Sequence, residues 1–285
     1  MTIRQHRQHI PPVSVGTTSI GGGHPLMIIA GPCVVEDHGV CVEVAQEVGR
    51  VCRDLGLGYV FKASYDKANK TIKGSYRGPG VASGIDALQA VKKAADVNVT
   101  TDVHEPEQCM EAAEVADLLQ IPAPLSKQID LIKAAAATGK PVNIKKGQFT
   151  APWEMSNVLS RLSDEGFENT MMTDRGYMFG YQTMIVDMRG LQIMSTIGKP
   201  VIFDASHTVH GNDTILSGTN LKHRDFIRPL ARSAVANGID GLFMEVHPDP
   251  DKALSDGAGT LALKDVEAVL KDIVAVDRAV AGQAT

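Results

Sequence analysis

The chain alternates short apolar runs with longer amphipathic stretches, and few folds accommodate that pattern when it is repeated this often. The apolar runs have the length of strands, and most are apolar over their first residues, as buried parallel strands are. They cover residues 26–32, 59–64, 99–104, 116–123, 141–147, 170–176, 201–207 and 241–247. A segment of helical length follows each run, and several of these segments end in glycine.

This repeated strand–helix order predicts a parallel sheet in an α/β protein. Eight such units in about 255 residues favour a closed (β/α)8 TIM barrel over an open, doubly wound sheet. Before the first run, "VSVGTTSIGGGHPL" alternates on either side of a turn, which predicts a β-hairpin that closes the bottom of the barrel. We therefore expect an N-terminal arm and hairpin over residues 1–25 and a single catalytic barrel domain over residues 26–280.

Composition excludes several classes of function. A formal net charge of -5 argues against a nucleic-acid partner, because binding to a phosphate backbone needs a concentrated basic face. No run of about 18 apolar residues is present, so we expect no membrane partner. The first residues lack the apolar core of a secretory signal. The cysteines Cys33, Cys41, Cys52 and Cys109 are therefore expected to be free thiols in the cytoplasm.

Polar residues follow the apolar start of nearly every run. Active sites of (β/α)8 barrels lie at the carboxyl ends of the strands, so closure of the barrel directs these side chains toward one volume. Charged residues near strand ends are often only solvated loop residues, which accounts for part of any such set. The set comprises Cys33, Lys62, Ser64, Asp102, His104, Lys127, Gln128, Lys145, Lys146, Asp174, Arg175, Asp204, His207, Glu245 and His247.

Several members of this ring are cationic although the protein is acidic overall. Convergent cations at a barrel mouth indicate an anionic substrate, such as a phosphate that also carries a carboxylate. Arginine offers a bidentate fork and lysine a point charge, and a phosphorylated carboxylic acid can use both. The basic group consists of Lys62, Lys67, Lys127, Lys145 and Arg175.

A second group, Cys33, His207, Glu245 and Asp256, has the composition of a metal site. Taken alone, Cys33 is more simply explained as a buried thiol, and His207 as a core histidine. Together they are expected to meet, because the first, seventh and eighth strands are neighbours in a closed barrel. One thiolate, one imidazole and two carboxylates suit a divalent transition ion.

Longer motifs resemble one family, the 3-deoxy-D-manno-octulosonate 8-phosphate synthases (2-dehydro-3-deoxyphosphooctonate aldolases). The resemblance runs from about residue 13 to the last helix. It implies a (β/α)8 barrel, usually a homotetramer in which a neighbour supplies residues near the active site. The motifs are "FKASYDKANKTIKGSYRGPG", "TDVHEPEQ", "LLQIPAPLSKQIDL", "NIKKGQF", "TDRGYMFGY", "VIFDASH" and "GLFMEVHPDPDKALSDG".

The resemblance implies a transferase that condenses phosphoenolpyruvate with arabinose 5-phosphate and releases phosphate, for the inner core of lipopolysaccharide. The family has metal-dependent members, which carry Cys after the Gly-Pro of the first strand, and metal-independent members, which carry Asn there. Cys33 places this chain in the metal-dependent class, and His207, Glu245 and Asp256 match the other ligand positions. Zn²⁺, Fe²⁺, Mn²⁺ and Co²⁺ all tolerate this set, and the ion can either activate water or orient the aldehyde.

Substrate positions follow from the same resemblance. The enol carbon would attack the aldehyde, water would add to C2, and C–O cleavage would expel phosphate. Lys67 is the candidate proton donor to the new alkoxide, and the metal-site residues Cys33, His207 and Asp256 are counted as catalytic with it. The positions matching the phosphoenolpyruvate site are Lys62, Ser64, Lys67, Gln128, Lys145 and Arg175, while Asn69 matches the aldose phosphate site, and Lys70 and Asp102 are also assigned to substrate binding.

Two departures leave alternatives open. The family motif Lys-Ala-Asn-Arg-Ser ends here in Lys70 and Thr71, and Lys127 replaces an arginine, which removes bidentate contacts to phosphate. A different aldose phosphate, such as erythrose 4-phosphate, is therefore an alternative, although synthases for that sugar typically carry Lys-Pro-Arg-Thr where this chain has residues 62–65. A metal-dependent aldolase (a lyase) and a non-catalytic binding barrel are further alternatives. Neither of these would release phosphate from phosphoenolpyruvate.

Overall fold

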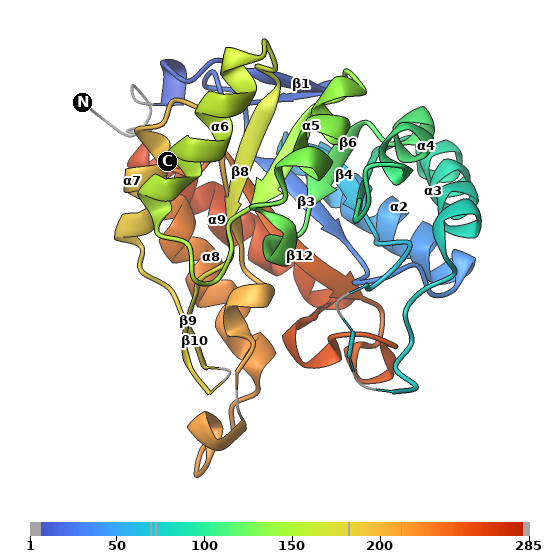
Figure 1. The fold of residues 1–285 in the computed structure, drawn as a ribbon. Coiled ribbons are helices and arrows are strands. Elements are labelled where there is room, and N and C mark those ends of the chain that lie inside the picture. Colours follow the sequence, from blue (N-terminus) through green and yellow to red (C-terminus); the bar gives the residue numbers. More distant parts are fainter. Residues whose placement is uncertain (1–6, 69, 72, 182, 212, 282–285) are drawn as a thin grey trace.

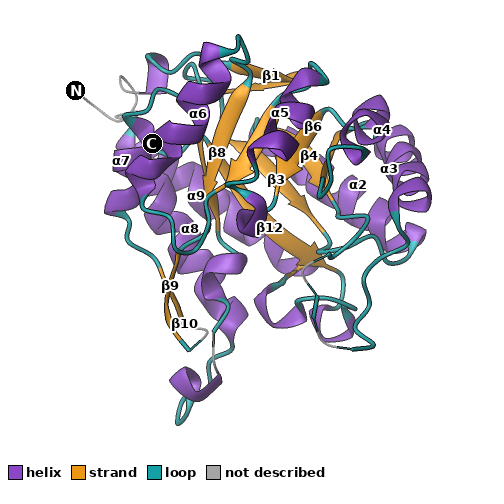
Figure 2. Ribbon diagram, viewed as in Figure 1, coloured by secondary structure: helices purple, strands orange, loops and turns teal. Residues whose placement is uncertain are grey.

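The computed structural model describes residues 7–68, 70–71, 73–181, 183–211 and 213–281. Within these residues, eight parallel strands pair in chain order, and the last pairs with the first, so that the sheet closes. The prediction of a (β/α)8 barrel is confirmed (Figure 2). The strands are β3 (Met27–Gly31), β4 (Gly58–Lys62), β5 (Asn98–Asp102), β6 (Leu118–Ile121), β7 (Val142–Lys145), β8 (Thr170–Asp174), β11 (Val201–Asp204) and β12 (Gly241–His247).

A helix follows each strand and covers the outside of the barrel (Figure 1). In the first of them, the Asp37 side chain accepts hydrogen bonds from the amides of Gly39 and Val40, and Gly56 ends the helix with a φ of 70°. The helices are α2 (His38–Leu55), α3 (Val81–Ala95), α4 (Gln108–Val115), α5 (Ile129–Ala137), α6 (Met155–Asp164), α7 (Arg189–Ser195), α8 (Ile227–Ala236) and α9 (Val266–Val280).

A short antiparallel hairpin, β1 (Val13–Val15) and β2 (Thr18–Ile20), closes the amino-terminal end of the barrel. Its turn is fixed by Asn98, at the start of β5, whose Oδ1 accepts a hydrogen bond of 3.1 Å from the Thr17 amide. Val15 and Ile20 are fully buried against interior residues of the barrel strands, including Phe243. The predicted hairpin and its position are therefore confirmed.

A second hairpin, β9 (Tyr177–Gly180) and β10 (Thr183–Ile185), was not predicted from the sequence. It follows β8 and extends away from the barrel beside the loop that follows β11 (Figure 1). A two-residue strand, β13 (Leu261–Ala262), also pairs with β12. Phe179 and Ile185 are exposed, so the hairpin lacks the buried alternation that marks a strand in a sequence.

The four cysteines are free and buried, so the absence of a disulfide between them is confirmed. Across the described ranges, no helix combines the length and the apolar character that a membrane span requires.

Candidate active site

A cavity of about 300 Å³ opens at the carboxyl ends of the barrel strands. Its wall combines four cations with apolar residues from the segment after β6. The lining residues are Lys62, Lys67, Ala68, Asp102, His104, Pro122, Ala123, Pro124, Leu125, Lys145, Gln148, Arg175 and His207. The convergence predicted for most of the basic residues is therefore present in the fold.

Lys62 and Asp102 form the floor of this cavity. The Lys62 Nζ donates to the Cys33 carbonyl at 3.1 Å and lies 3.4 Å from the Asp102 Oδ2. Asp102 also accepts hydrogen bonds from the Ser64 hydroxyl and, at 2.7 Å, from the Gln120 amide. Burial opposes ionisation of Asp102, but the surrounding lysines, Lys62 first, hold its pKa well below the usual range. The carboxylate thus pairs with a buried lysine and holds it in place.

Lys145 and Arg175 supply the other deep cations. Lys145 forms an ion pair with Asp204, and its Nζ lies 3.8 Å from the centre of the Phe243 ring. Burial lowers the pKa of Lys145, although Asp204 acts in the opposite direction. Arg175 is only 9% exposed, and no carboxylate in the described ranges lies within ion-pair distance of it. Its guanidinium, which approaches Met184 Sδ at 3.5 Å, is available to an anion in the cavity.

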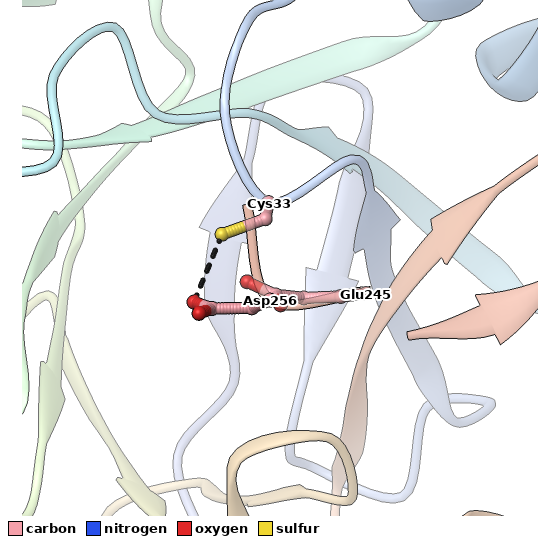
Figure 3. A group of neighbouring side chains, drawn as sticks. All are labelled: Cys33, Glu245 and Asp256. Carbon is pink, nitrogen blue, oxygen red and sulfur yellow. Dashed lines mark hydrogen bonds between the residues drawn. The ribbon is translucent and has the colours of Figure 1, made fainter. Parts of the chain in front are cut away.

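Cys33, Glu245 and Asp256 point toward one another beside this cavity (Figure 3). One ligand atom from each lies within 4.8 Å of the others. The Cys33 Sγ lies 3.0 Å from the Ser255 hydroxyl and 3.2 Å from the Asp256 Oδ2. Burial, followed by the charge of Glu245, raises the pKa of the Cys33 thiol well above its usual range, so the thiol is protonated here.

Glu245 is the strongest indication that this cluster suits a metal ion. It is fully buried, and within the described ranges neither carboxylate oxygen has a hydrogen-bond partner. The Lys62 and Lys67 ammonium groups are 3.9 Å from its Oε1, too far for hydrogen bonds. A buried carboxylate without hydrogen bonds is costly, and a divalent cation would compensate that cost. The thiol and the two carboxylates therefore fit the donor set expected for a transition ion.

His207 stands at the edge of the cluster. Its Nε2 is 3.6 Å from the Glu245 Oε1, while its Nδ1 is 2.8 Å from the Asp204 Oδ2. This contact orients the imidazole with Nε2 toward Glu245, the arrangement usual for a histidine that ligates a metal. Asp204 belongs to the predicted ring of strand-end residues, but its sequence position predicted no role for it. Its spacing three residues before His207, at the end of the same strand, is the signal that would have identified it.

Other predicted residues lie elsewhere. Lys127 and Gln128 do not reach the cavity, because Pro122 begins a turn after β6 that carries both outward, and Lys127 lies 3.7 Å from Glu154. Asn69 lies outside the described residues. The Lys70 Nζ is 2.7 Å from the Asp256 Oδ1. Gln148, three residues beyond β7, also lines the cavity. It was not predicted because its side chain is uncharged and the residues singled out at strand ends were mainly charged.

A second cavity, of about 390 Å³, adjoins the first and shares Gln148 and Arg175 with it. Asp256 and His210 contribute to its lining. Burial lowers the pKa of His210 to about 4, and the neighbouring His207 acts in the same direction. His210 is therefore a neutral imidazole near pH 7. Arg175 lines both cavities, and the second, which Asp213 and Asp256 also line, is more acidic than the first.

Comparison with known proteins finds relatives that cover nearly the whole chain. The model of the DAHP synthetase I family matches residues 4–281. A protein of Desulfotalea psychrophila named 2-dehydro-3-deoxyphosphooctonate aldolase is 49% identical over 261 residues, which cover 92% of this chain and 93% of that protein. Proteins of the same name from Geotalea uraniireducens and Syntrophotalea carbinolica are 48% and 46% identical, covering 93% and 95% of this chain and 97% of each relative. The chain therefore belongs to the DAHP synthetase I family.

Proposed function

We propose that the protein is a 3-deoxy-D-manno-octulosonate 8-phosphate synthase. It condenses phosphoenolpyruvate with arabinose 5-phosphate and water, releases phosphate, and supplies the inner core of lipopolysaccharide. The similar proteins that carry the equivalent name, 2-dehydro-3-deoxyphosphooctonate aldolase, cover nearly the whole chain. The observation that supports the proposal most directly is the placement of a cationic cavity beside the cluster of Cys33, Glu245 and Asp256.

Phosphoenolpyruvate would bind in the first cavity. Lys62, Lys145 and Arg175 line it, and they match the phosphate and carboxylate charges of this substrate. As phosphate leaves, negative charge accumulates on its oxygens, and cations already in position stabilise that charge without rearrangement.

Lys67 is the proposed acid. It is buried, lines the same cavity, and its Nζ is 3.9 Å from the Glu245 Oε1. Burial opposes its charge, but Cys33, once it is a thiolate, and Glu245 hold the pKa of Lys67 above its usual range. The side chain therefore carries the proton that the alkoxide needs once the enol carbon has attacked the aldehyde.

A divalent ion, Zn²⁺, Fe²⁺, Mn²⁺ or Co²⁺, is proposed to bind Cys33, His207, Glu245 and Asp256. When bound, it would act as a Lewis acid toward the aldehyde oxygen or toward water. To bind the ion, the Cys33 thiol must lose its proton. Glu245 has no hydrogen bond to break, because it is fully buried and its two oxygens lack hydrogen bonds to other described residues.

The protein is also proposed to act as a homotetramer in the cytoplasm. Large apolar side chains lie exposed on the β9–β10 hairpin and in the segment after β7, as expected of a surface that contacts another subunit. They are Phe149, Trp153, Phe179, Tyr181 and Ile185. The free cysteines agree with a reducing compartment.

Phosphate release tests the proposed reaction. The purified protein would be given phosphoenolpyruvate with arabinose 5-phosphate, with erythrose 4-phosphate, or without a sugar. We expect stoichiometric phosphate and the eight-carbon product with arabinose 5-phosphate only. Faster release with erythrose 4-phosphate would overturn the choice of sugar, and no release with any sugar would overturn the synthase.

A further inference from the structure

Lys70 and Asp256 form an ion pair directly at the proposed metal site, with their charged atoms 2.7 Å apart. We propose that Lys70 competes with the divalent ion for the Asp256 carboxylate and so weakens metal binding. This inference rests on the proposed function, because it concerns the ion that the synthase would hold.

The contacts of Asp256 support this competition. Lys70 occupies its Oδ1, and the Cys33 thiol lies 3.2 Å from its Oδ2. Glu245, in contrast, has no hydrogen bond on either oxygen within the described ranges. A cation that joins the three side chains therefore displaces no hydrogen bond from Glu245, but it must displace a proton from Cys33 and an ammonium group from Asp256.

Lys70 is able to leave, whereas the other nearby ammonium groups are confined. Its side chain is 25% exposed, while Lys62 and Lys67 are 1% and 9% exposed and line the substrate cavity. A flexible lysine at the surface regains hydration when it swings out. The ammonium thus neutralises Asp256 in the metal-free protein and is repelled when a divalent charge enters.

A second arrangement predicts the opposite effect. If Lys70 kept its bond to Oδ1 while the ion bound through Oδ2, the lysine would orient the ligand and strengthen metal binding. Removing its charge would then weaken binding. The sign of the change in affinity therefore separates competition from support.

The experiment compares Lys70→Met and Lys70→Arg with Lys252→Met as a matched control. Lys252 belongs to the same loop as Asp256, is 82% exposed, and lies 2.8 Å from Asp249, so its removal deletes the same charge and a similar pair. The dissociation constant of Zn²⁺ would be measured by chelator competition. Cobalt binding would be followed by the thiolate-to-cobalt absorption.

We expect Lys70→Met to bind Zn²⁺ roughly three- to tenfold more tightly than the unmodified protein, the range expected of a partly exposed ion pair. The dissociation constants of Lys70→Arg and Lys252→Met for Zn²⁺ should stay within about twofold of that of the unmodified protein. High salt should reduce the difference in affinity between Lys70→Met and the unmodified protein. Unchanged or weaker binding by Lys70→Met would overturn the proposal. Equal tightening in Lys70→Arg or Lys252→Met would also overturn it, because the effect would not depend on the ammonium group at Asp256.

These outcomes are separable from failure of the proposed function. If the unmodified protein binds Zn²⁺ but Lys70→Met does not differ from it, only the competition is refuted. If the unmodified protein binds neither Zn²⁺ nor Co²⁺, both the competition and the metal site are refuted, and phosphate release still judges the synthase reaction on its own.

Discussion

Asp204 shows how much one buried carboxylate does for this site. It accepts hydrogen bonds from the amides of Ser206 and His207, contacts the His207 Nδ1 at 2.8 Å, and pairs with Lys145. Burial opposes its ionisation, yet His207 and Lys145 hold the pKa of Asp204 well below the usual range. One side chain therefore positions a proposed metal ligand and a proposed substrate ligand.

We expect Asp204→Asn to lower metal affinity roughly 10- to 100-fold, because the amide no longer fixes the Nδ1 proton of His207. Affinity would be measured by chelator competition, with the exposed Asp187→Asn as the control. An affinity equal to that of the control would contradict this role.

Several candidate residues that the sequence places at strand ends lie together in the structure. Cys33 and Glu245 could be predicted together because barrel closure makes β3 and β12 neighbours. The Lys70–Asp256 pair could not, since 186 positions separate its partners and loop conformation alone brings them together. Gln128 was assigned from its place in a motif, and the turn that begins at Pro122 carries it away from the cavity.

Among the elements, the loops after β7 and β8 are joined by Lys146. This fully buried lysine donates to the carbonyls of Gly147 at 3.2 Å and Gly176 at 3.1 Å, and it lies 3.4 Å from the Asp174 Oδ1. The two loops carry Gln148 and Arg175, so the lysine fixes one wall of the first cavity.

We expect Lys146→Met to lower the free energy of unfolding by roughly 3–5 kcal/mol, because it leaves Asp174 buried without its partner. It should also raise the KM for phosphoenolpyruvate. Lys133→Met, which removes a partly exposed pair with Glu165, should cost less than about 1 kcal/mol. Urea denaturation checks both, and similar losses in the two variants would refute the assignment.

Helix α2 buries Cys41, and burial raises the pKa of this thiol from 9.0 to about 11. As pH rises, the thiol loses its proton in the unfolded chain before it does so in the folded protein. The contribution of Cys41 to the free energy of unfolding is therefore complete below pH 9.0 and declines toward pH 11. Through Cys41, the free energy of unfolding of the unmodified protein should fall by about 3 kcal/mol over this pH range. We expect the Cys41→Ala variant to lack this fall. Val48→Ala, on the same buried face, should lower the free energy of unfolding equally at each pH. If that free energy fell with pH equally steeply in both variants, the effect could not be assigned to the Cys41 thiol.

The barrel strands were predictable because they are buried on both faces, which leaves short continuous apolar runs in the sequence. The helices were predictable because each buries one face, which leaves periodic apolar residues. The β9–β10 hairpin was not, because Phe179 and Ile185 are exposed and only the fold shows that this segment pairs with itself. Elements that pack in the core can therefore be predicted from the sequence more accurately than elements that extend from it.

For the molecule as a whole, the exposed apolar surface near the β9–β10 hairpin should set the oligomeric state. Phe179 is 78% exposed and Phe149 81% exposed in the single chain. Phe179→Glu would place a charge in the proposed subunit contact, so we expect smaller species in sedimentation at micromolar concentration. Met110→Glu, on an exposed position of α4, serves as the control. A Phe179→Glu protein that sediments like the unmodified one would exclude this surface from the interface.

The most direct test of a metal-dependent synthase is phosphate release from phosphoenolpyruvate and arabinose 5-phosphate before chelation, after chelation and after return of a divalent ion. We expect activity to disappear with the metal and to return with Zn²⁺, Fe²⁺, Mn²⁺ or Co²⁺, and Cys33→Ser to recover far less under the same treatment. Full activity in the chelated protein would contradict the metal site at Cys33, Glu245 and Asp256.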